Sequence, residues 1–108
     1  MYYIDLDTRD YKKLATGVHA RTFWGENMLL AVVDLDANAI LPSHSHVHEQ
    51  CGIVIEGKLQ YNIGGEIKTL TDGQIYIIPS GIEHSVVVGS QPARVLDVFS
   101  PVREEYKY

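Results

Sequence analysis

The sequence predicts an all-β protein with the architecture of an antiparallel sandwich or barrel. Short apolar runs rich in β-branched residues recur along most of the chain, and turn signals separate them at intervals of about eight to twelve residues. No convincing helical period follows the first part of the chain, up to about residue 20. The apolar runs are spread over all 108 residues without a linker or low-complexity segment. We therefore expect residues 1–108 to form one domain.

The expected elements are short and follow one another closely. Residues 10–15 are compatible with one helical turn. Residues 36–38 predict a turn, because aspartate and asparagine tolerate left-handed backbone, and Gly64-Gly65 predicts a tight hairpin. The predicted strands cover residues 28–35, 52–55, 58–63, 66–70, 74–78, 85–88 and 94–99.

The excess of acidic over basic residues indicates which partners the protein is not expected to bind. Formal charge is −5, from 9 basic and 14 acidic residues, and no basic run extends beyond Lys12-Lys13. We therefore expect no nucleic-acid binding, which needs clustered cations. No segment approaches the roughly 20 apolar residues of a membrane span, and the N-terminus lacks the cationic start and apolar stretch of a signal peptide. These features predict a cytoplasmic protein with no membrane partner.

Cys51 is the only cysteine. A single thiol excludes an internal disulfide and a thiolate metal site. Because Cys51 lies beside Gly52 and the apolar residues 53–55, we expect it to be a buried structural residue.

Four residues in two stretches of the chain are candidate ligands of one metal ion. They are His44, His46, Gln50 and His84. Two histidines at positions i and i+2 of an extended strand project from the same side, and a later strand followed by a Pro-Ser-Gly turn brings the third. Imidazole suits zinc, copper, iron and nickel. His48 has the same parity as His44 and His46, so periodicity alone leaves its role open.

These stretches resemble the two motifs of the cupin superfamily, which implies a double-stranded β-helix (jelly-roll) barrel. The first motif, G-x5-H-x-H-x3,4-E-x6-G, is matched by Asn38, His44, His46, Gln50 and Gly57. The second, G-x5-P-x-G-x2-H-x3-N, is matched by Gly73, Pro79, Gly81, His84 and Val88. Asn38 replaces the first glycine, Gln50 the glutamate and Val88 the final asparagine.

The glutamine at position 50 has a chemical consequence. Its amide oxygen is neutral, so three imidazoles and an amide leave the charge of a divalent cation uncompensated. Such a cation is a stronger Lewis acid towards an anionic substrate oxygen. The alternative is that Gln50 forms hydrogen bonds within the barrel and that only the three histidines bind the metal.

A closer resemblance joins this chain to the small cupins called pectin degradation proteins. It rests on residues 44–50, 79–84 and 97–105. The resemblance implies conversion of 4,5-unsaturated monouronates, from pectin or alginate breakdown, into linear ketonised sugar acids. It also implies one divalent transition metal (zinc, nickel, manganese or iron) held by the four candidate ligands. Asp97, Phe99 and Arg103 would line the pocket for this small anionic sugar acid.

The residues of this last segment are compatible with those roles. Asp97 and Phe99 share one face of the last predicted strand, and an aspartate between Leu96 and Val98 needs a polar partner. Asp97 would transfer a proton as general acid or base, and Arg103 would bind a carboxylate in bidentate fashion at the barrel mouth. The alternative is a structural pair between Asp97 and Arg103. Without the resemblance, Phe99 would be assigned to the core.

Two other classes of function remain open from the sequence. Histidine-rich iron sites activate dioxygen in other cupins, although the missing carboxylate counts against an iron facial triad here. A non-catalytic domain that binds a sugar or another small molecule is the third class. Cupins are often dimers, and we expect a homodimer. Tyr2, Tyr3, Phe23 and Trp24 are candidates either for its interface or for closing the barrel.

Overall fold

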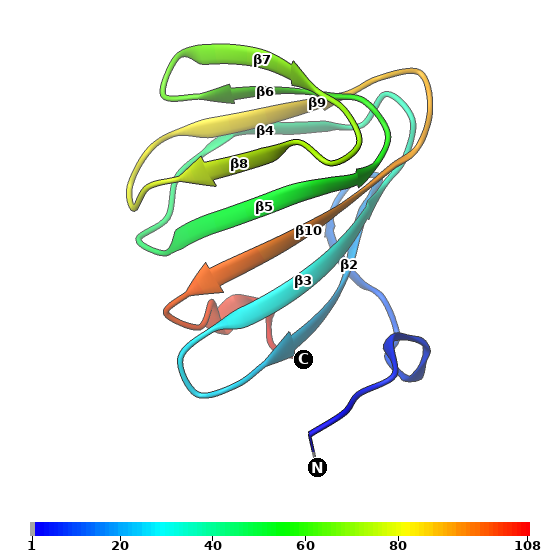
Figure 1. Ribbon diagram of the computed structural model, residues 1–108, viewed down its shortest axis with the longest axis vertical. Helices are drawn as coiled ribbons and strands as arrows, with labels where there is room; N and C mark the ends of the chain where they lie inside the picture. Colours follow the sequence, from blue (N-terminus) through cyan, green and yellow to red (C-terminus); the bar gives the residue numbers. More distant parts are fainter. Residues whose placement is uncertain (1) are drawn as a thin grey trace.

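A computed structural model describes residues 2–108 and confirms an all-β chain folded into two facing antiparallel sheets (Figure 1). The first six strands are β1 (Lys12–Ala15), β2 (Val18–Trp24), β3 (Leu29–Leu35), β4 (Ile40–His44), β5 (Glu49–Glu56) and β6 (Leu59–Ile63). They are followed by β7 (Glu66–Leu70), β8 (Ile75–Ile78), β9 (His84–Val88) and β10 (Ala93–Ser100). Two short 3-10 helices, η1 (Leu6–Thr8) and η2 (Glu104–Tyr106), lie near the ends of the chain. In residues 2–108 neither has the length or apolar character that crossing a membrane requires.

The two sheets differ in size. The larger contains six strands in the order β1-β2-β3-β10-β5-β8, and the smaller contains four in the order β4-β9-β6-β7. Strands of the larger sheet alternate between buried and more exposed residues, as in β10, because only one face of each strand meets the core. The core therefore lies between the sheets, and the candidate site lies at one end of it.

The predicted turns are confirmed. Gly64 and Gly65 both have positive φ (57° and 91°), the combination that a two-residue hairpin between β6 and β7 requires. Among residues 2–108, Asn38 is the only non-glycine residue with positive φ (62°). This position is the one where the first cupin motif has glycine. Asparagine fits there because it is among the few residues that adopt left-handed backbone readily.

The helical turn expected over residues 10–15 is wrong. Residues 12–15 form β1, which pairs with β2 in antiparallel fashion. β2 itself was not predicted from the sequence. Its buried residues include Arg21 and Thr22 as well as apolar ones, so its apolar pattern is interrupted. Residues 18–24 form a strand because they pair with β3, although their own sequence favours a strand only weakly.

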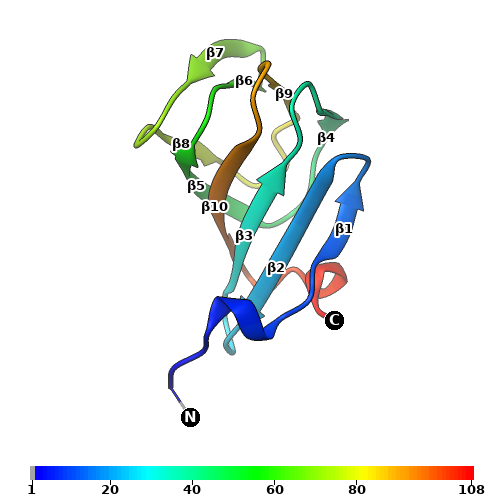
Figure 2. The ribbon, with the colours of Figure 1, turned by 90° about the vertical axis from the view of Figure 1, so that its right-hand side faces the viewer.

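The expectation that Cys51 is buried is also wrong, since its side chain is exposed in the single chain. On β5 the inward positions are Gln50, Gly52 and Val54, so Cys51 and Ile53 point to the outer face. Tyr2 and Tyr3 do not close the barrel, because they are 97 % and 92 % exposed. The N-terminal segment that carries them extends away from the strands (Figure 2).

Candidate metal centre and adjoining pocket

Two of the histidines face each other because of strand register. His44 at the end of β4 is the direct partner of His84 at the start of β9. Their ring centroids are 4.2 Å apart. Between the pairs Leu41–Val86 and His44–His84, β4 has two intervening residues where β9 has one, so β4 carries a bulge. The extra residue turns His44 towards the cavity.

The third histidine comes from the link between the two sheets. β4 ends at His44, and His46 lies in the connection to β5. Its ring centroid is 5.0 Å from that of His84 and 6.0 Å from that of His44. One ligand atom from each of the three imidazoles lies within 4.8 Å of the others, an arrangement able to hold a metal ion. His48 is not part of this group within residues 2–108, which fits a chain that bends at residues 47–48.

Each imidazole has its proton fixed by a backbone carbonyl. Nδ1 of His44 lies 2.9 Å from the oxygen of Pro42, and Nδ1 of His84 lies 2.9 Å from that of Ile82. Nδ1 of His46 lies 3.0 Å from the oxygen of His48. Because a carbonyl only accepts, Nδ1 must donate in all three cases, and each Nε2 is left with a free lone pair. Metal-binding histidines commonly have this arrangement, in which the ring nitrogen that does not face the metal donates to a carbonyl or carboxylate oxygen.

Two further observations test whether a cation fits. Nε2 of His84 is buried and has no hydrogen-bond partner among the described residues. Nε2 of His46 and Oε1 of Gln50 lie 3.1 Å apart. With the His46 proton on Nδ1, both of these atoms are acceptors, and a shared cation would satisfy both. The donor set of three imidazoles and one amide oxygen therefore fits a divalent transition metal.

Burial keeps His46 and His84 neutral. Burial lowers the pKa of His46 to about 4, with smaller contributions from the nearby charges of Arg103 and His84. Burial also lowers the pKa of His84. Metal binding requires the neutral ring, so at neutral pH these two rings have no proton to lose before they bind.

Asp97 lies on the floor of the site, in a row set by sheet register. Asp97 on β10 pairs with Gly52 on β5, which pairs in turn with Tyr76 on β8. Because Gly52 has no side chain, Tyr76 reaches across β5 and donates its hydroxyl to Oδ1 of Asp97 at 2.6 Å. A Cβ added at Gly52 would overlap both the Tyr76 ring and Oδ1 of Asp97. Tyr61 of the smaller sheet stacks on Tyr76, with centroids 4.3 Å apart.

Burial governs the acidity of Asp97. Removal from water raises the pKa of this carboxyl to about 6, although hydrogen bonds from Tyr76 and Gln50 and the charge of Arg103 oppose the shift. Gln50, which helps to hold this pKa down, also has its amide oxygen 3.1 Å from Nε2 of His46. Gln50 thus connects the acid to the histidine group.

The C-terminal segment supplies the positive charge. The guanidinium of Arg103 lies over the rings of Phe99 and Tyr106, at 5.1 and 4.0 Å from their centroids. Nε of Arg103 contacts Glu105 at 3.1 Å, and the arginine side chain is 12 % exposed. Asp97 instead has Tyr76 as its direct partner. The structural pair between Asp97 and Arg103 is therefore not formed among the described residues.

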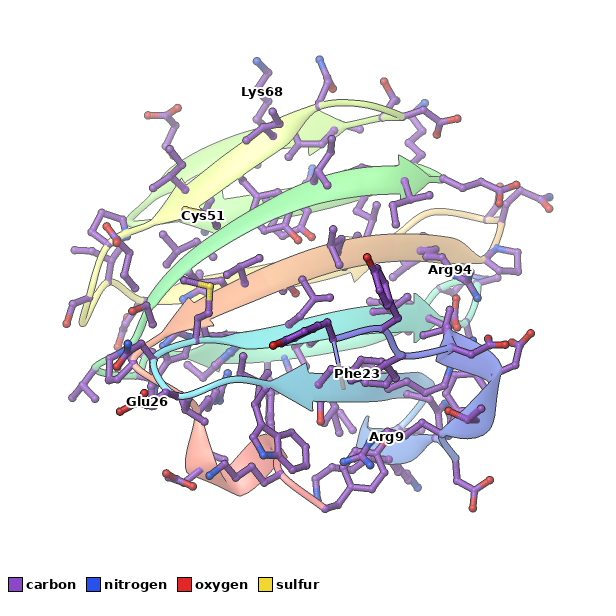
Figure 3. The ribbon with its side chains drawn as sticks, turned by 60° about the horizontal axis from the view of Figure 1, so that its bottom comes forward. Arg9, Phe23, Glu26, Cys51, Lys68 and Arg94 are labelled. Atoms are coloured by element: carbon purple, nitrogen blue, oxygen red, sulfur yellow. The ribbon has the colours of Figure 1, made fainter. Side chains whose placement is uncertain are left out.

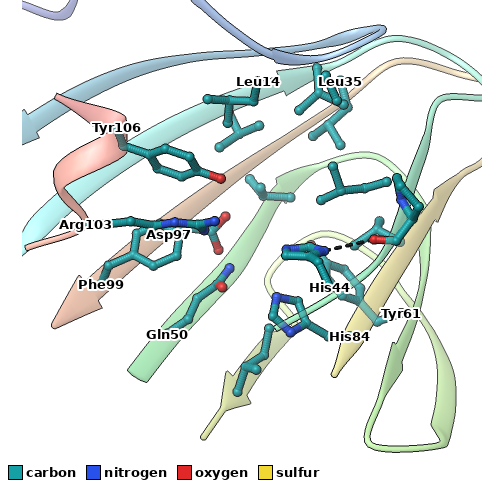
Figure 4. A pocket seen from close by; sticks show the side chains of 18 residues that line it. Leu14, Leu35, His44, Gln50, Tyr61, His84, Asp97, Phe99, Arg103 and Tyr106 are labelled. Atoms are coloured by element: carbon teal, nitrogen blue, oxygen red, sulfur yellow. Dashed lines mark hydrogen bonds between the residues drawn. The ribbon is translucent and has the colours of Figure 1, made fainter. Parts of the chain in front are cut away.

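One cavity of about 310 Å³ joins these groups (Figure 4). Its lining includes six of the seven site residues predicted from the sequence, namely His44, Gln50, His84, Asp97, Phe99 and Arg103. The seventh, His46, is outside this lining but has its ring 5.0 Å from that of His84. Figure 4 shows the imidazoles of His44 and His84 at one end, with Leu14 and Leu35 at the opposite end. The cavity thus has a polar end able to hold a metal and an apolar end.

Sequence reasoning missed Tyr76, Tyr61 and Tyr106. Each depends on contacts between segments far apart in the chain, and each was indistinguishable in the sequence from a core aromatic. Gly52, a glycine inside a predicted strand, is the signal that was available, because such glycines mark close approach of another group.

Comparison with known proteins agrees with the fold and motifs. An uncharacterized protein of Streptomyces coelicolor is 27 % identical over 97 residues, which is 89 % of this chain and 92 % of that one. An RmlC-like cupin from Shewanella frigidimarina has a TM-score of 0.92 at 24 % identity, covering 99 % of this chain and 96 % of its own. KdgF from a Halomonas species has a TM-score of 0.89, also at 24 % identity, covering 99 % and 98 %. Residues 31–99 match the Cupin domain family. This chain belongs to that family.

Proposed function

We propose that this protein is a metal-dependent enzyme that opens and ketonises 4,5-unsaturated monouronates. The observation that carries the proposal is one cavity lined by His44, His84, the buried carboxyl group of Asp97 and Arg103, with the imidazole of His46 grouped with the other two. A monouronate offers matching groups: hydroxyl and ring oxygens for a metal, acidic protons for a carboxylate, and its own carboxylate for a guanidinium.

The proposed reaction is an isomerisation. In the ring form the ring oxygen joins C1 to C5, and C5 is doubly bonded to C4. When the bond from C1 to the ring oxygen breaks, the C1 hydroxyl loses its proton and becomes an aldehyde, while the ring oxygen gains a proton and becomes an enol on C5. Loss of the enol proton and addition of a proton at C4 then give the ketone. Every proton is returned, so the reaction needs proton transfer but no oxidant or reductant.

The residues divide this chemistry between them. Arg103 would bind the substrate carboxylate, since its guanidinium lies over the rings of Phe99 and Tyr106 within the cavity lining. Asp97 would accept and return protons, because its pKa of about 6 makes both protonation states accessible near neutral pH. Phe99 and Tyr106 would form an apolar wall that excludes water. A metal held by His44, His46, His84 and Gln50 would supply a Lewis acid to the sugar oxygens.

The test is a spectroscopic assay on metal-analysed protein. Elemental analysis of purified protein should give one divalent transition metal per chain. A lyase-generated 4,5-unsaturated monouronate absorbs in the ultraviolet, and this absorbance should disappear when the protein is added. The rate should be the same with and without oxygen, and zinc or nickel should restore it after chelation.

Other outcomes would point to the other two functions. Strict dependence on dioxygen would favour a cupin dioxygenase. Saturable sugar binding without loss of absorbance, in fully metal-loaded protein, would favour a sugar-binding protein.

A further inference from the structure

The cavity continues well past the groups that the proposed reaction uses. On the larger sheet, Asp97 of β10 pairs with Ala31 of β3, and the next inward-facing pair is Val95 with Val33. Leu35 lies two residues beyond Val33 on the same strand. Val95, Val33 and Leu35 all line the cavity. At about 3.3 Å per residue, the level of Leu35 is about 13 Å from that of Asp97.

Aliphatic side chains from five strands surround this far part of the cavity. Figure 4 shows two of them, Leu14 and Leu35, at the opposite end from His44 and His84. Protein cores seldom contain voids larger than a water molecule, so a cavity that extends between these side chains is more than a packing defect. The side chains that we call the apolar end are Leu14, Val18, Val33, Leu35, Leu41 and Val95.

The chemistry of the apolar end selects hydrocarbon. None of its six side chains carries a hydrogen-bond donor or acceptor. A sugar hydroxyl placed there would give up its hydrogen bonds to water without replacement, which is costly. An aliphatic group leaves water without such a loss, and apolar cavities of about 150 Å³ bind small hydrocarbons. The whole cavity is about 310 Å³, so a hydrocarbon chain fits beside the polar groups.

Arg103 determines the head group of such a ligand. Its side chain lines the same cavity, and Figure 4 shows it reaching inwards beside Asp97. Nε of Arg103 donates to Glu105, and the rest of the guanidinium retains N–H donors for a second acceptor. A carboxylate is the anion that this planar fork binds best among simple organic groups.

We infer that the cavity binds a linear saturated monocarboxylate of about six to eight carbon atoms. Its carboxylate contacts Arg103 and its chain lies along the apolar end. With bonds of about 1.5 Å, an extended chain of eight carbons is about 9 Å long, which fits the distance of about 13 Å to the level of Leu35. The inference goes beyond the proposed uronate reaction and does not require it. Because both ligands use Arg103, they exclude each other.

A second apolar hollow is the competing site for the same ligand. It lies on the outer face of the larger sheet, where Figure 3 labels Phe23, and Arg9 lies 5.7 Å from the centre of that ring. This outer hollow therefore also combines apolar side chains with a cation. Tyr2 in its lining is 97 % exposed, so a chain bound there stays largely in water. The outer hollow is lined by Tyr2, Ile4, Leu6, Phe23, Leu30 and Val32.

The test is an NMR titration of isotopically labelled, zinc-loaded protein with butanoate, hexanoate and octanoate. Affinity should rise about fourfold for each buried methylene, and so about 200-fold from butanoate to octanoate. Methyl signals of Leu35 and Val95 should shift, whereas those of Leu30 and Val32 should not. A rise below tenfold, or shifts confined to Leu30 and Val32, would overturn the inference without any substitution.

Matched substitutions separate the two apolar sites. Leu14→Gln and Leu41→Gln each place an amide at the apolar end, at positions that are only partly buried. Each should reduce the advantage of octanoate over butanoate to less than tenfold while the affinity for butanoate changes by less than about twofold. Leu30→Gln is the control in the outer hollow and should keep the full chain-length dependence. The reverse pattern would place the chain in the outer hollow and refute the inference.

Arg103→Gln tests the head group. It should weaken all three carboxylates by the same factor, about tenfold or more, because each loses the same charge-assisted contact. The dependence on chain length should remain. Octanoate affinity that is unaltered in Arg103→Gln would overturn the assignment. None of these measurements uses uronate turnover, so failure of the proposed reaction and failure of this inference give different results.

Discussion

The two sheets face one cavity but equip it in different ways. The smaller sheet and its link to β5 contribute His44, His46 and His84, and each of these rings is oriented by a backbone carbonyl. The larger sheet contributes Gln50 and Asp97, and Asp97 accepts a hydrogen bond from the side chain of Tyr76. The half that holds the candidate metal ligands therefore depends on backbone geometry, whereas the acidic half depends on a side-chain contact that a single substitution can remove.

The largest expected effect comes from removing a ligand on the smaller sheet. His84→Ala should abolish stoichiometric metal binding, because no described neighbour can replace the lost Nε2. Activity should disappear with the metal. His48→Ala is the matched control, since His48 lies outside the histidine group. Metal content measured by elemental analysis should fall in the first variant and stay near one per chain in the second. Equal occupancy in the two would show that the ion binds elsewhere.

On the larger sheet, Asp97→Asn keeps the shape of the side chain but removes its ability to exchange a proton. We expect kcat for loss of the unsaturated uronate to fall by roughly 10² to 10⁴, with metal content unchanged. An unaltered kcat in folded, metal-loaded protein would make Asp97 a structural residue and would favour the sugar-binding function.

The same substitution should stabilise the metal-free protein. The pKa of Asp97 is about 6 in the folded state against an ordinary value of 3.8. Between these values the folded protein holds the proton and the unfolded chain does not, so the free energy of unfolding of the wild type decreases as pH rises from about 4 to about 6. The Asp97→Asn protein has no carboxyl proton to lose at this position. Its free energy of unfolding, relative to that of the wild type, should therefore be about 3 kcal/mol higher above pH 6 than at pH 4. Urea unfolding at pH 4 and pH 7 measures the change. A constant difference between the two proteins would contradict it.

Arg103→Ala tests the proposed contact with the substrate carboxylate. Loss of a charge-assisted bidentate contact should cost about 1.5–3 kcal/mol in kcat/KM, or roughly 10- to 150-fold. Arg103→Lys should recover only part of this, because an ammonium group cannot reproduce the planar fork or its stacking on Phe99 and Tyr106. Full recovery with lysine would mean that charge alone is required there.

Tyr76→Phe should produce the smallest effect. It keeps the ring that stacks on Tyr61 but removes the hydroxyl that Asp97 accepts. Loss of one such hydrogen bond is worth about 1 kcal/mol, so we expect up to a tenfold decrease in kcat with little change in KM. Tyr11→Phe is the control, as it removes a similar bond to Asp34 outside the cavity. If both variants lower kcat equally, the effect is one of general stability.

Much of this arrangement was predictable because it is local in the sequence. The Gly64-Gly65 turn, the strands on either side of it and the turn at Asn38 follow from single-residue backbone preferences. The convergence of His44, His46 and His84 was predictable because the spacing of both motifs is specific.

The remaining features were not predictable because they depend on pairing between distant strands. β1 and β2 lack a regular apolar pattern, and their pairing with each other and with β3 defines them. The side of β5 on which Cys51 lies follows from register, which the uninterrupted apolar run of residues 53–55 does not reveal. The partner of Asp97 is 21 residues away in sequence, on a strand that β5 separates from β10.

The bulge in β4 lets this strand carry one residue more than its partner without moving a candidate metal ligand off the cavity side. In a regular strand, residues 41 and 44 point to opposite faces. The bulge absorbs the additional residue between the pairs Leu41–Val86 and His44–His84, so both side chains lie on the cavity side. Deleting Ser43 alone would remove the bulge, and regular alternation would still direct His44 to the cavity. Deleting both Pro42 and Ser43 would make Leu41 and His44 adjacent and direct His44 to the outer surface. In homologous chains, loss of one residue between these two positions should therefore be more common than loss of both.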